Sequence, residues 1–184
     1  MIRAAALAAL VAAALAGCGS SEEPAADSLK TPPAEDAAMH LTSTAFAAGM
    51  TIPAKYTCDG AGRSPPLQWS GEPGATQSFV LAVEDPDAPH GTFRHWGVYD
   101  IPAGTHELPP GANSFGQTKN DFGHLGYGAP CPPKGDQPHH YHFRLLALDV
   151  AQLPGTPAKV KNLLDAAAGH VLASADLVVL YRRQ

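Results

Sequence analysis

The feature of this chain that most restricts its fold is a series of short apolar segments separated by turns of proline and glycine. Four segments have the length and composition of β-strands: QSFVLAVED at 77–85, FRHWGVYDI at 93–101, HYHFRLLALD at 140–149 and ADLVVLYR at 175–182. A fifth, MHLTSTAF at 39–46, alternates between apolar and polar residues. Turn sequences such as GEPG and LPPG separate the segments, and the chain holds 18 glycines and 18 prolines. This pattern predicts an all-β or β-dominated sandwich.

One segment near the C-terminus has the periodicity of a helix instead. Its apolar residues recur at helical spacing at Val160, Leu163, Leu164, Ala167 and Val171. Thr156 is suited to cap the N-terminus of this helix, and Pro157 is suited to its first position. We therefore expect a single late helix that begins after Thr156.

The N-terminus has the composition of an export signal. Arg3 is followed by a short apolar stretch, 4–14, and then by Leu15-Ala16-Gly17-Cys18, which resembles a bacterial lipobox. This sequence predicts a lipoprotein signal peptide over residues 1–17, cleaved before Cys18, with acyl chains on the cysteine that anchor the protein to a membrane. The alternative is an ordinary signal peptide that happens to end near a cysteine.

The segment that follows the signal peptide is rich in Ser, Glu, Pro, Ala and Asp. It has almost nothing to bury, so residues 18–38 are expected to form a lipidated flexible tether and residues 39–184 the folded domain. We expect the domain to lie outside the cytoplasm. Gly19, rather than Asp, follows the cysteine. In a cell with two membranes this choice resembles the sorting signal for the outer membrane, where the domain would face the periplasm. The net charge of −5 and the lack of a basic stripe argue against a nucleic-acid partner.

Export also bears on the two cysteines that remain, Cys58 and Cys131. Paired thiols persist in an oxidising compartment, so we predict a Cys58–Cys131 disulfide. It would close a loop of about seventy residues and contribute up to roughly 4 kcal/mol in the chain-entropy model. The alternatives are two buried free thiols or a nucleophile, although no obvious base flanks either cysteine.

Strand alternation places polar side chains at the ends of apolar rows. The row that starts at Phe79 ends in Asp85, and His139 and Tyr141 are the first residues of the apolar row in 139–147. The opposite face of that segment is more polar, with His140, His142 and Arg144.

The same alternation puts His95, Gly97 and Tyr99 on one face of the segment 93–101. If the ends of these three strands meet, their polar groups form a small cup with an apolar floor. A register slip of one residue would turn each row to the other face of the sheet.

Several separated motifs resemble the phosphatidylethanolamine-binding protein family, in its bacterial Raf-kinase-inhibitor-like branch. The two main stretches are DPDAPHGTFRHW at 85–96 and PPKGDQPHHYHF at 132–143. TCDGAGRSPPLQW at 57–69, NDFGHLGYGAPCPPKG at 120–135 and the C-terminal GHVLASADLVVLYRR also match, in the same order. The resemblance implies a two-sheet antiparallel sandwich with a C-terminal helix.

The resemblance also implies a ligand pocket for small anions such as phosphate or a phospholipid head group. The matching positions are Asp85, Asp87, His95, Pro133, His139 and Tyr141. We expect the aspartates to orient the histidines and raise their pKa values, or to meet an ammonium group of the ligand. Animal members of the family have a further pocket tyrosine near the C-terminus. No residue here is matched to it, although Tyr181 lies near the corresponding place in the sequence. Taken singly, Asp85 could instead cap a turn, and His139 could be a hydrogen-bonded core histidine.

Two other functional classes compete with a binding protein. An extracytoplasmic inhibitor of a protease or another protein would act through its surface. A metal-dependent or acid–base hydrolase, using residues such as Asp87 and His95, is less favoured because neither G-x-S-x-G nor H-E-x-x-H occurs. We therefore expect a membrane-anchored binding protein with no cofactor, no bound metal and no enzymatic activity.

Overall fold

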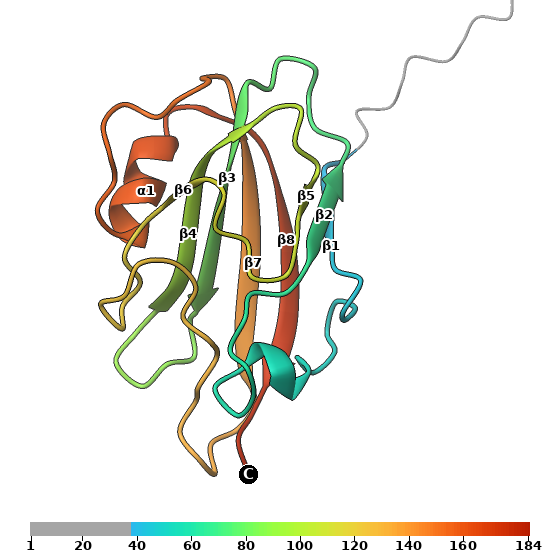
Figure 1. Cartoon of the computed structure of the whole chain (residues 1–184), viewed down its shortest axis with the longest axis vertical. Helices are drawn as coiled ribbons and strands as arrows, with labels where there is room; N and C mark the ends of the chain where they lie inside the picture. The colour runs from blue at the N-terminus through green and yellow to red at the C-terminus, as the bar shows by residue number, and fades with distance from the viewer. Residues whose placement is uncertain (1–37) are drawn as a thin grey trace, which may run out of the picture. The chain divides into compact units, whose positions relative to one another are not determined.

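The structure is a computed structural model that describes residues 38–184. A five-stranded antiparallel sheet forms its centre. Its spatial order is β6 (Gly116–Gln117), β4 (Phe93–Pro102), β3 (Ser78–Asp85), β7 (His139–Leu148) and β8 (Val171–Tyr181). Strand β3 is buried on both faces because a layer covers each side of the sheet (Figure 1). Its unbroken run of apolar residues therefore suits a central position.

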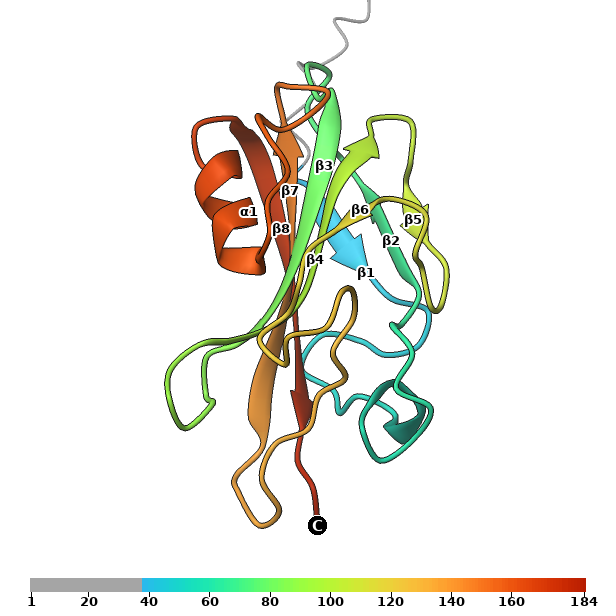
Figure 2. The same cartoon turned by 60° about the vertical axis from the view of Figure 1, so that its left-hand side comes forward.

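A smaller sheet covers one face of the large one. It contains β1 (His40–Thr42), β2 (Leu67–Ser70) and β5 (Glu107–Leu108), and a short 3-10 helix, η1 (Ala54–Tyr56), precedes β2 (Figure 2). The main core lies between the sheets, where the inward residues of both interdigitate. Its larger members include Leu67, Trp69, Phe79, Leu81, Trp96, Phe143 and Leu145.

Helix α1 (Val160–Ala167) packs on the opposite face of the large sheet (Figure 2). Leu163 and Ala167 join a second apolar cluster with residues of β3 and β7 and of the loop after β7, namely Val80, Leu146, Leu148 and Leu153. The observed layers are thus small sheet, large sheet and late helix, which confirms the predicted two-sheet antiparallel sandwich.

The position of the helix differs from the prediction. Its N-cap is Lys159, which is extended and makes no side-chain cap bond, so Thr156 and Pro157 do not start the helix. The reason is a tertiary contact: the N–H of Lys119 donates to the carbonyl oxygen of Ala158 at 3.0 Å, which holds this segment in a bridge. Val171, expected on the helix, is the first residue of β8.

The predicted face of His95 is also wrong, because β4 contains a bulge. Trp96 pairs with Val83 and Arg94 pairs with Glu84, which leaves His95 as the extra residue. A bulge of this kind re-aims the side chain beside it. His95 consequently faces the interior like Trp96, whereas Gly97 faces helix α1 on the other side of the sheet.

Three predictions concern residues outside the described part of the chain. They are the signal peptide over 1–17, the acylation of Cys18 and all of the tether over 18–38 except its last residue. Among residues 38–184, no helix is both long enough and apolar enough to span a membrane.

Candidate functional site

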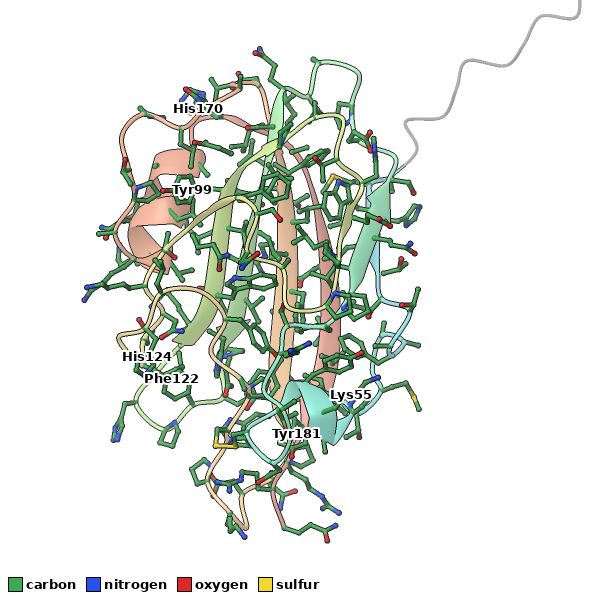
Figure 3. The ribbon with its side chains drawn as sticks, in the orientation of Figure 1. Lys55, Tyr99, Phe122, His124, His170 and Tyr181 are labelled. Atoms are coloured by element: carbon green, nitrogen blue, oxygen red, sulfur yellow. A yellow bond between two sulfur atoms is a disulfide. The ribbon has the colours of Figure 1, made fainter. Side chains whose placement is uncertain are left out.

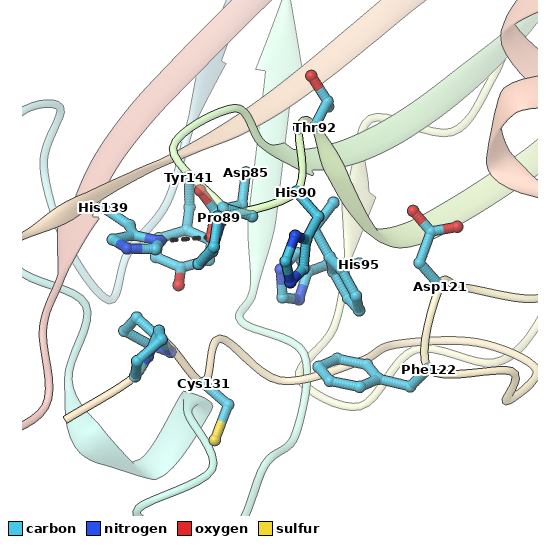
Figure 4. Close-up of a pocket in the computed structure, with 15 residues that line it drawn as sticks. Asp85, Pro89, His90, Thr92, His95, Asp121, Phe122, Cys131, His139 and Tyr141 are labelled. Atoms are coloured by element: carbon cyan, nitrogen blue, oxygen red, sulfur yellow. Dashed lines mark hydrogen bonds and ion pairs between the residues drawn. The ribbon is translucent and has the colours of Figure 1, made fainter. Parts of the chain in front are cut away.

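A cavity of about 490 Å³ lies at one end of the large sheet, where β3, β4 and β7 converge with two loops. Five of the six predicted pocket residues line it: Asp85, His95, Pro133, His139 and Tyr141. Figure 4 shows Asp85, His139 and Tyr141 on one side of this space and His95 with Phe122 on the other. The expected convergence of polar strand ends therefore occurs.

A buried hydrogen-bonded pair forms one wall of the cavity. Nδ1 of His139 lies 2.8 Å from Oδ2 of Asp85, and the two residues are only 5% and 3% exposed (Figure 4). Because a carboxylate only accepts, Nδ1 donates and the other ring nitrogen, Nε2, remains for another partner. Nε2 lies 3.7 Å from Oδ2 of Asp136. Asp85 also accepts the N–H of Asp87 at 3.0 Å, so it caps the turn after β3 as well.

His95 forms the opposite wall within a set of aromatic rings. Its Nδ1 lies 2.8 Å from the carbonyl oxygen of Gly128, so Nδ1 carries the hydrogen and donates. Burial lowers the pKa of His95 more than the nearby charges of Asp85 and Asp121 raise it. Asp85 thus raises the pKa of this histidine as expected, but the net pKa is lowered because desolvation dominates in a residue that is 2% exposed.

Two buried polar atoms of the lining have no hydrogen-bond partner among the described residues. They are Nε2 of His95 and the hydroxyl oxygen of Tyr141. Burial raises the pKa of Tyr141 far above its usual range, and the negative charge of Asp85 and the approach of its carboxylate to the hydroxyl add to this rise, so the hydroxyl keeps its hydrogen. Leaving such atoms unpaired costs about 1–3 kcal/mol each, which marks the cavity as a place for a polar ligand.

Asp87 is the predicted residue that does not line the cavity. Its Oδ2 accepts the backbone N–H of His140 at 2.8 Å and lies 2.7 Å from Nδ1 of the same residue. The hydrogen bond from that backbone N–H, and then the one from the ring, lower the pKa of Asp87. Asp87 thus ties the loop after β3 to the start of β7, which places His139 beside Asp85.

Several lining residues were not predicted as pocket residues, although they lie within the motifs that resemble the family. Phe93 and Phe122 stack around His95, with ring centroids 5.0 and 5.6 Å from it. Four others come from the loop after β3 and from the loop that carries Phe122: Pro89, His90, Thr92 and Asp121. The aromatic residues close to His95 in the sequence could have indicated that aromatic rings line the pocket. Strand alternation cannot predict which residues of a loop line it.

The disulfide between Cys58 and Cys131 is present, with Cα atoms 5.4 Å apart. Cys131, Pro132 and Pro133 line the cavity, and Figure 4 shows Cys131 on its lower side. The disulfide therefore fastens this wall to the segment that follows η1.

Tyr181 does not contribute to the cavity. Its hydroxyl donates to Oδ2 of Asp59 at 2.6 Å, and Nε and Nη2 of Arg183 contact the same carboxylate. Figure 3 shows Tyr181 near η1, at the base of the molecule, away from Phe122. The pKa of Asp59 is lowered, first by the hydrogen bond from Tyr181 and then by Arg183.

The charges around the cavity are unusual for an anion site. Among the described lining residues there are two carboxylates, Asp85 and Asp121, and neither lysine nor arginine. Hydrogen bonds from histidine and tyrosine must therefore supply most of the attraction for an anion. Within residues 38–184, no cluster of three or more His, Cys, Asp or Glu has an arrangement that could hold a metal ion.

Comparison with known proteins agrees with this geometry. The family model described as phosphatidylethanolamine-binding protein matches residues 42–182. The chain belongs to the phosphatidylethanolamine-binding protein family. The match spans all ten elements of the described domain except the first residues of β1, and it includes every residue that lines the cavity.

Related members of the family come from bacteria and archaea. The chain is 46% identical over 154 residues to the UPF0098 protein of Aquifex aeolicus, which covers 80% of this chain and 90% of that protein. It is 38% identical over 167 residues to the UPF0098 protein YbcL of Escherichia coli, covering 80% of this chain and 90% of YbcL.

Solved structures of the family have the same fold. The crystal structure of the phosphatidylethanolamine-binding protein homolog CT736 from Chlamydia trachomatis matches with a TM-score of 0.73 and 41% identity, over 80% of this chain and 99% of that chain. The structure of E. coli YbcL matches with a TM-score of 0.74 and 33% identity, over 79% of this chain and 99% of that chain.

Proposed function

We propose that this protein binds small phosphate-type anions, free or as the head group of a phospholipid, in the cavity between Asp85 and His95. The observation that carries the proposal is the pair of unpartnered buried polar atoms, Nε2 of His95 and the Tyr141 hydroxyl, in one cavity with the buried His139–Asp85 pair. Membership of the family supports a binding role of this kind.

The chemistry of the walls suits an oxyanion. Tyr141 donates through its hydroxyl, and His139, when protonated, donates through Nε2 while Asp85 holds Nδ1. Hydrogen bonds from a charged donor to a phosphate oxygen are about twice as strong as neutral ones. Asp85 orients His139, and Asp85 and Asp121 also offer acceptors to an ammonium group, so a zwitterionic head group can be accommodated.

The proposal includes the compartment. The lipobox-like sequence that ends at Cys18 supports export and lipid anchoring, with the domain on the extracytoplasmic side of a bacterial membrane. Mass spectrometry of intact protein extracted from membranes tests this: a mass that starts at Cys18 and includes acyl chains is expected. An unmodified chain that retains residues 1–17 would contradict it.

The test of the binding role is an NMR titration of the domain with inorganic phosphate and with phosphoethanolamine. We expect ligand-dependent shifts at His95 and His139 and a weakening of binding by roughly 1.5–3 kcal/mol, about ten- to a hundredfold, in His139→Ala. His142→Ala is the matched control, because His142 pairs with Asp176 on the outer face of the sheet. The absence of shifts with both ligands, or equal affinity in His139→Ala, contradicts the proposal.

A further inference from the structure

We infer that the cavity selects an anion that brings its own hydrogen-bond donor, because His95 presents an acceptor, Nε2, to the ligand. The inference rests on the proposed binding function and makes it more specific: the preferred ligand accepts from Tyr141 and His139 and donates to His95. A fully deprotonated oxyanion can satisfy only one half of this arrangement.

The first step is the hydrogen position on His95. Nδ1 lies 2.8 Å from the carbonyl oxygen of Gly128, and a carbonyl only accepts. In the neutral ring, the hydrogen is therefore on Nδ1 and the lone pair on Nε2. Burial, which lowers the pKa of this histidine, favours the neutral ring over the doubly protonated one. Nε2 is then an acceptor that has no partner within the described residues.

The second step is the charge of the lining. Asp85 and Asp121 are the acidic residues of the cavity wall, and no lysine or arginine of the described chain lines it. A dianion that enters this space meets two carboxylates and the lone pair of His95, opposed by protonated His139 and by Arg94, whose Nη1 lies 3.9 Å from Oδ2 of Asp121. A ligand that carries one negative charge and a hydrogen on a neighbouring atom avoids much of this repulsion.

The third step is the opposite wall, which supplies donors. The Tyr141 hydroxyl is buried and unpartnered, and its ring centroid lies 5.3 Å from that of His95. The His139 ring stacks on the other side of Tyr141, with centroids 6.5 Å apart. Donors and the acceptor therefore line the same cavity.

Access to His95 involves Phe122. Phe93, Phe122 and Tyr141 surround the imidazole, and of these three rings only Phe122 is largely exposed, at 44%. Phe122 is thus the most exposed of the three rings around the imidazole.

Two classes of ligand meet the requirement. A phosphate or phosphomonoester with one proton has a P–O–H donor, and a monoester has its second pKa near about 6. A phosphodiester head group has no such hydrogen, but an ethanolamine head group has ammonium N–H donors. Sulfate and a choline diester have acceptor oxygens of similar shape and no donor.

The test uses two matched pairs of probes in calorimetric titrations of the wild-type domain at about pH 6. Inorganic phosphate is compared with sulfate, and glycerophosphoethanolamine with glycerophosphocholine. We expect the member with a donor to bind about ten- to a hundredfold tighter than its partner. A preference in the first pair identifies the phosphate hydroxyl as the donor, and a preference in the second identifies the head-group ammonium.

Substitutions at His95 assign the effect to the acceptor. His95→Asn can keep a donor to Gly128 while it removes the atom at Nε2, so the preference for the donor-bearing probe should fall to about twofold or less. His95→Gln places an amide group near Nε2 that can accept or donate, so it should also bind sulfate. ¹⁵N NMR of the imidazole in wild type provides a readout that needs no variant: Nε2 should be unprotonated without ligand and should shift on adding phosphate.

The outcomes separate the two claims. Equal affinity within both pairs, or a protonated Nε2 in the phosphate complex, overturns the donor requirement and leaves the binding function in place. Failure of all four probes to bind overturns the proposed function, and this inference with it. A preference that survives unchanged in a folded His95→Asn variant shows that another group is responsible and also overturns the inference.

Discussion

Tyr141 and His95 hold polar atoms that a folded protein normally pairs. Buried groups of this kind without a partner reduce stability, and each calls for an explanation such as a catalytic role or a bound water or ion. Here both atoms lie in the same cavity, next to a histidine whose orientation Asp85 fixes. The residues of this site therefore favour binding at some expense to the free energy of unfolding.

Tyr141→Phe tests this trade-off directly. The change removes an unpaired buried hydroxyl, so we expect the free energy of unfolding to be unchanged or higher by about 1 kcal/mol, while affinity for phosphate falls about tenfold. Urea unfolding and calorimetry measure the two quantities on one preparation.

Tyr127→Phe is the matched control, because the Tyr127 hydroxyl donates to the carbonyl oxygen of Tyr56 at 2.9 Å. This variant should lose about 1 kcal/mol of stability and keep its phosphate affinity. A Tyr141→Phe variant that is clearly destabilised would show that its hydroxyl has a structural partner after all.

Helix α1 contacts the large sheet at a point where only glycine fits. A Cβ on Gly97 would lie 2.9 Å from Cδ2 of Leu163 and 3.2 Å from Cγ2 of Val160, and it would clash with Oγ1 of Thr118. Gly97→Ala should therefore lower the free energy of unfolding by about 1–3 kcal/mol through overpacking. Chemical denaturation measures the change.

Gly74→Ala is the control for that experiment, since an added Cβ there meets nothing within 4 Å. It should change the free energy of unfolding by about 0.5 kcal/mol or less. If both variants are equally stable, the helix can move away from β4 without cost, and the close contact at Gly97 is not what limits its position.

The strands and the helix were predictable from the sequence where burial alone determines the pattern of apolar residues. Strands β3 and β7 were expected close to their observed bounds because long apolar runs and clean alternation mark them. Strands β5 and β6 have two residues each, which is too short for any periodicity to show. The start of α1 was misplaced because Ala158 bonds to Lys119, far away in the sequence, and local capping preferences cannot report such a contact.

The site depends on the whole molecule, because its residues come from β3, β4, β7 and two loops. Alternation grouped Asp85, His95, His139 and Tyr141 at converging strand ends, and the family resemblance added Asp87 and Pro133. The reason for the orientation of His95 is the bulge in β4, which the sequence does not reveal. Asp87 was predicted with the others but pairs with His140 instead, since two aspartates separated by one turn residue need not face the same way.

The Cys58–Cys131 disulfide acts on the same scale, because it joins segments 73 residues apart and one of its cysteines lines the cavity. A Cys58→Ala/Cys131→Ala variant should lose about 2–4 kcal/mol of unfolding free energy, since the unfolded chain regains the entropy that the closed loop removes. We expect phosphate affinity to fall as well, because the wall formed by Pro132 and Pro133 is no longer fastened to the segment after η1. Urea unfolding and calorimetry measure both effects, and a reductant should change the wild type in the same direction while leaving the variant unaffected. Unaltered stability in the variant would show that the two segments are held together by packing alone.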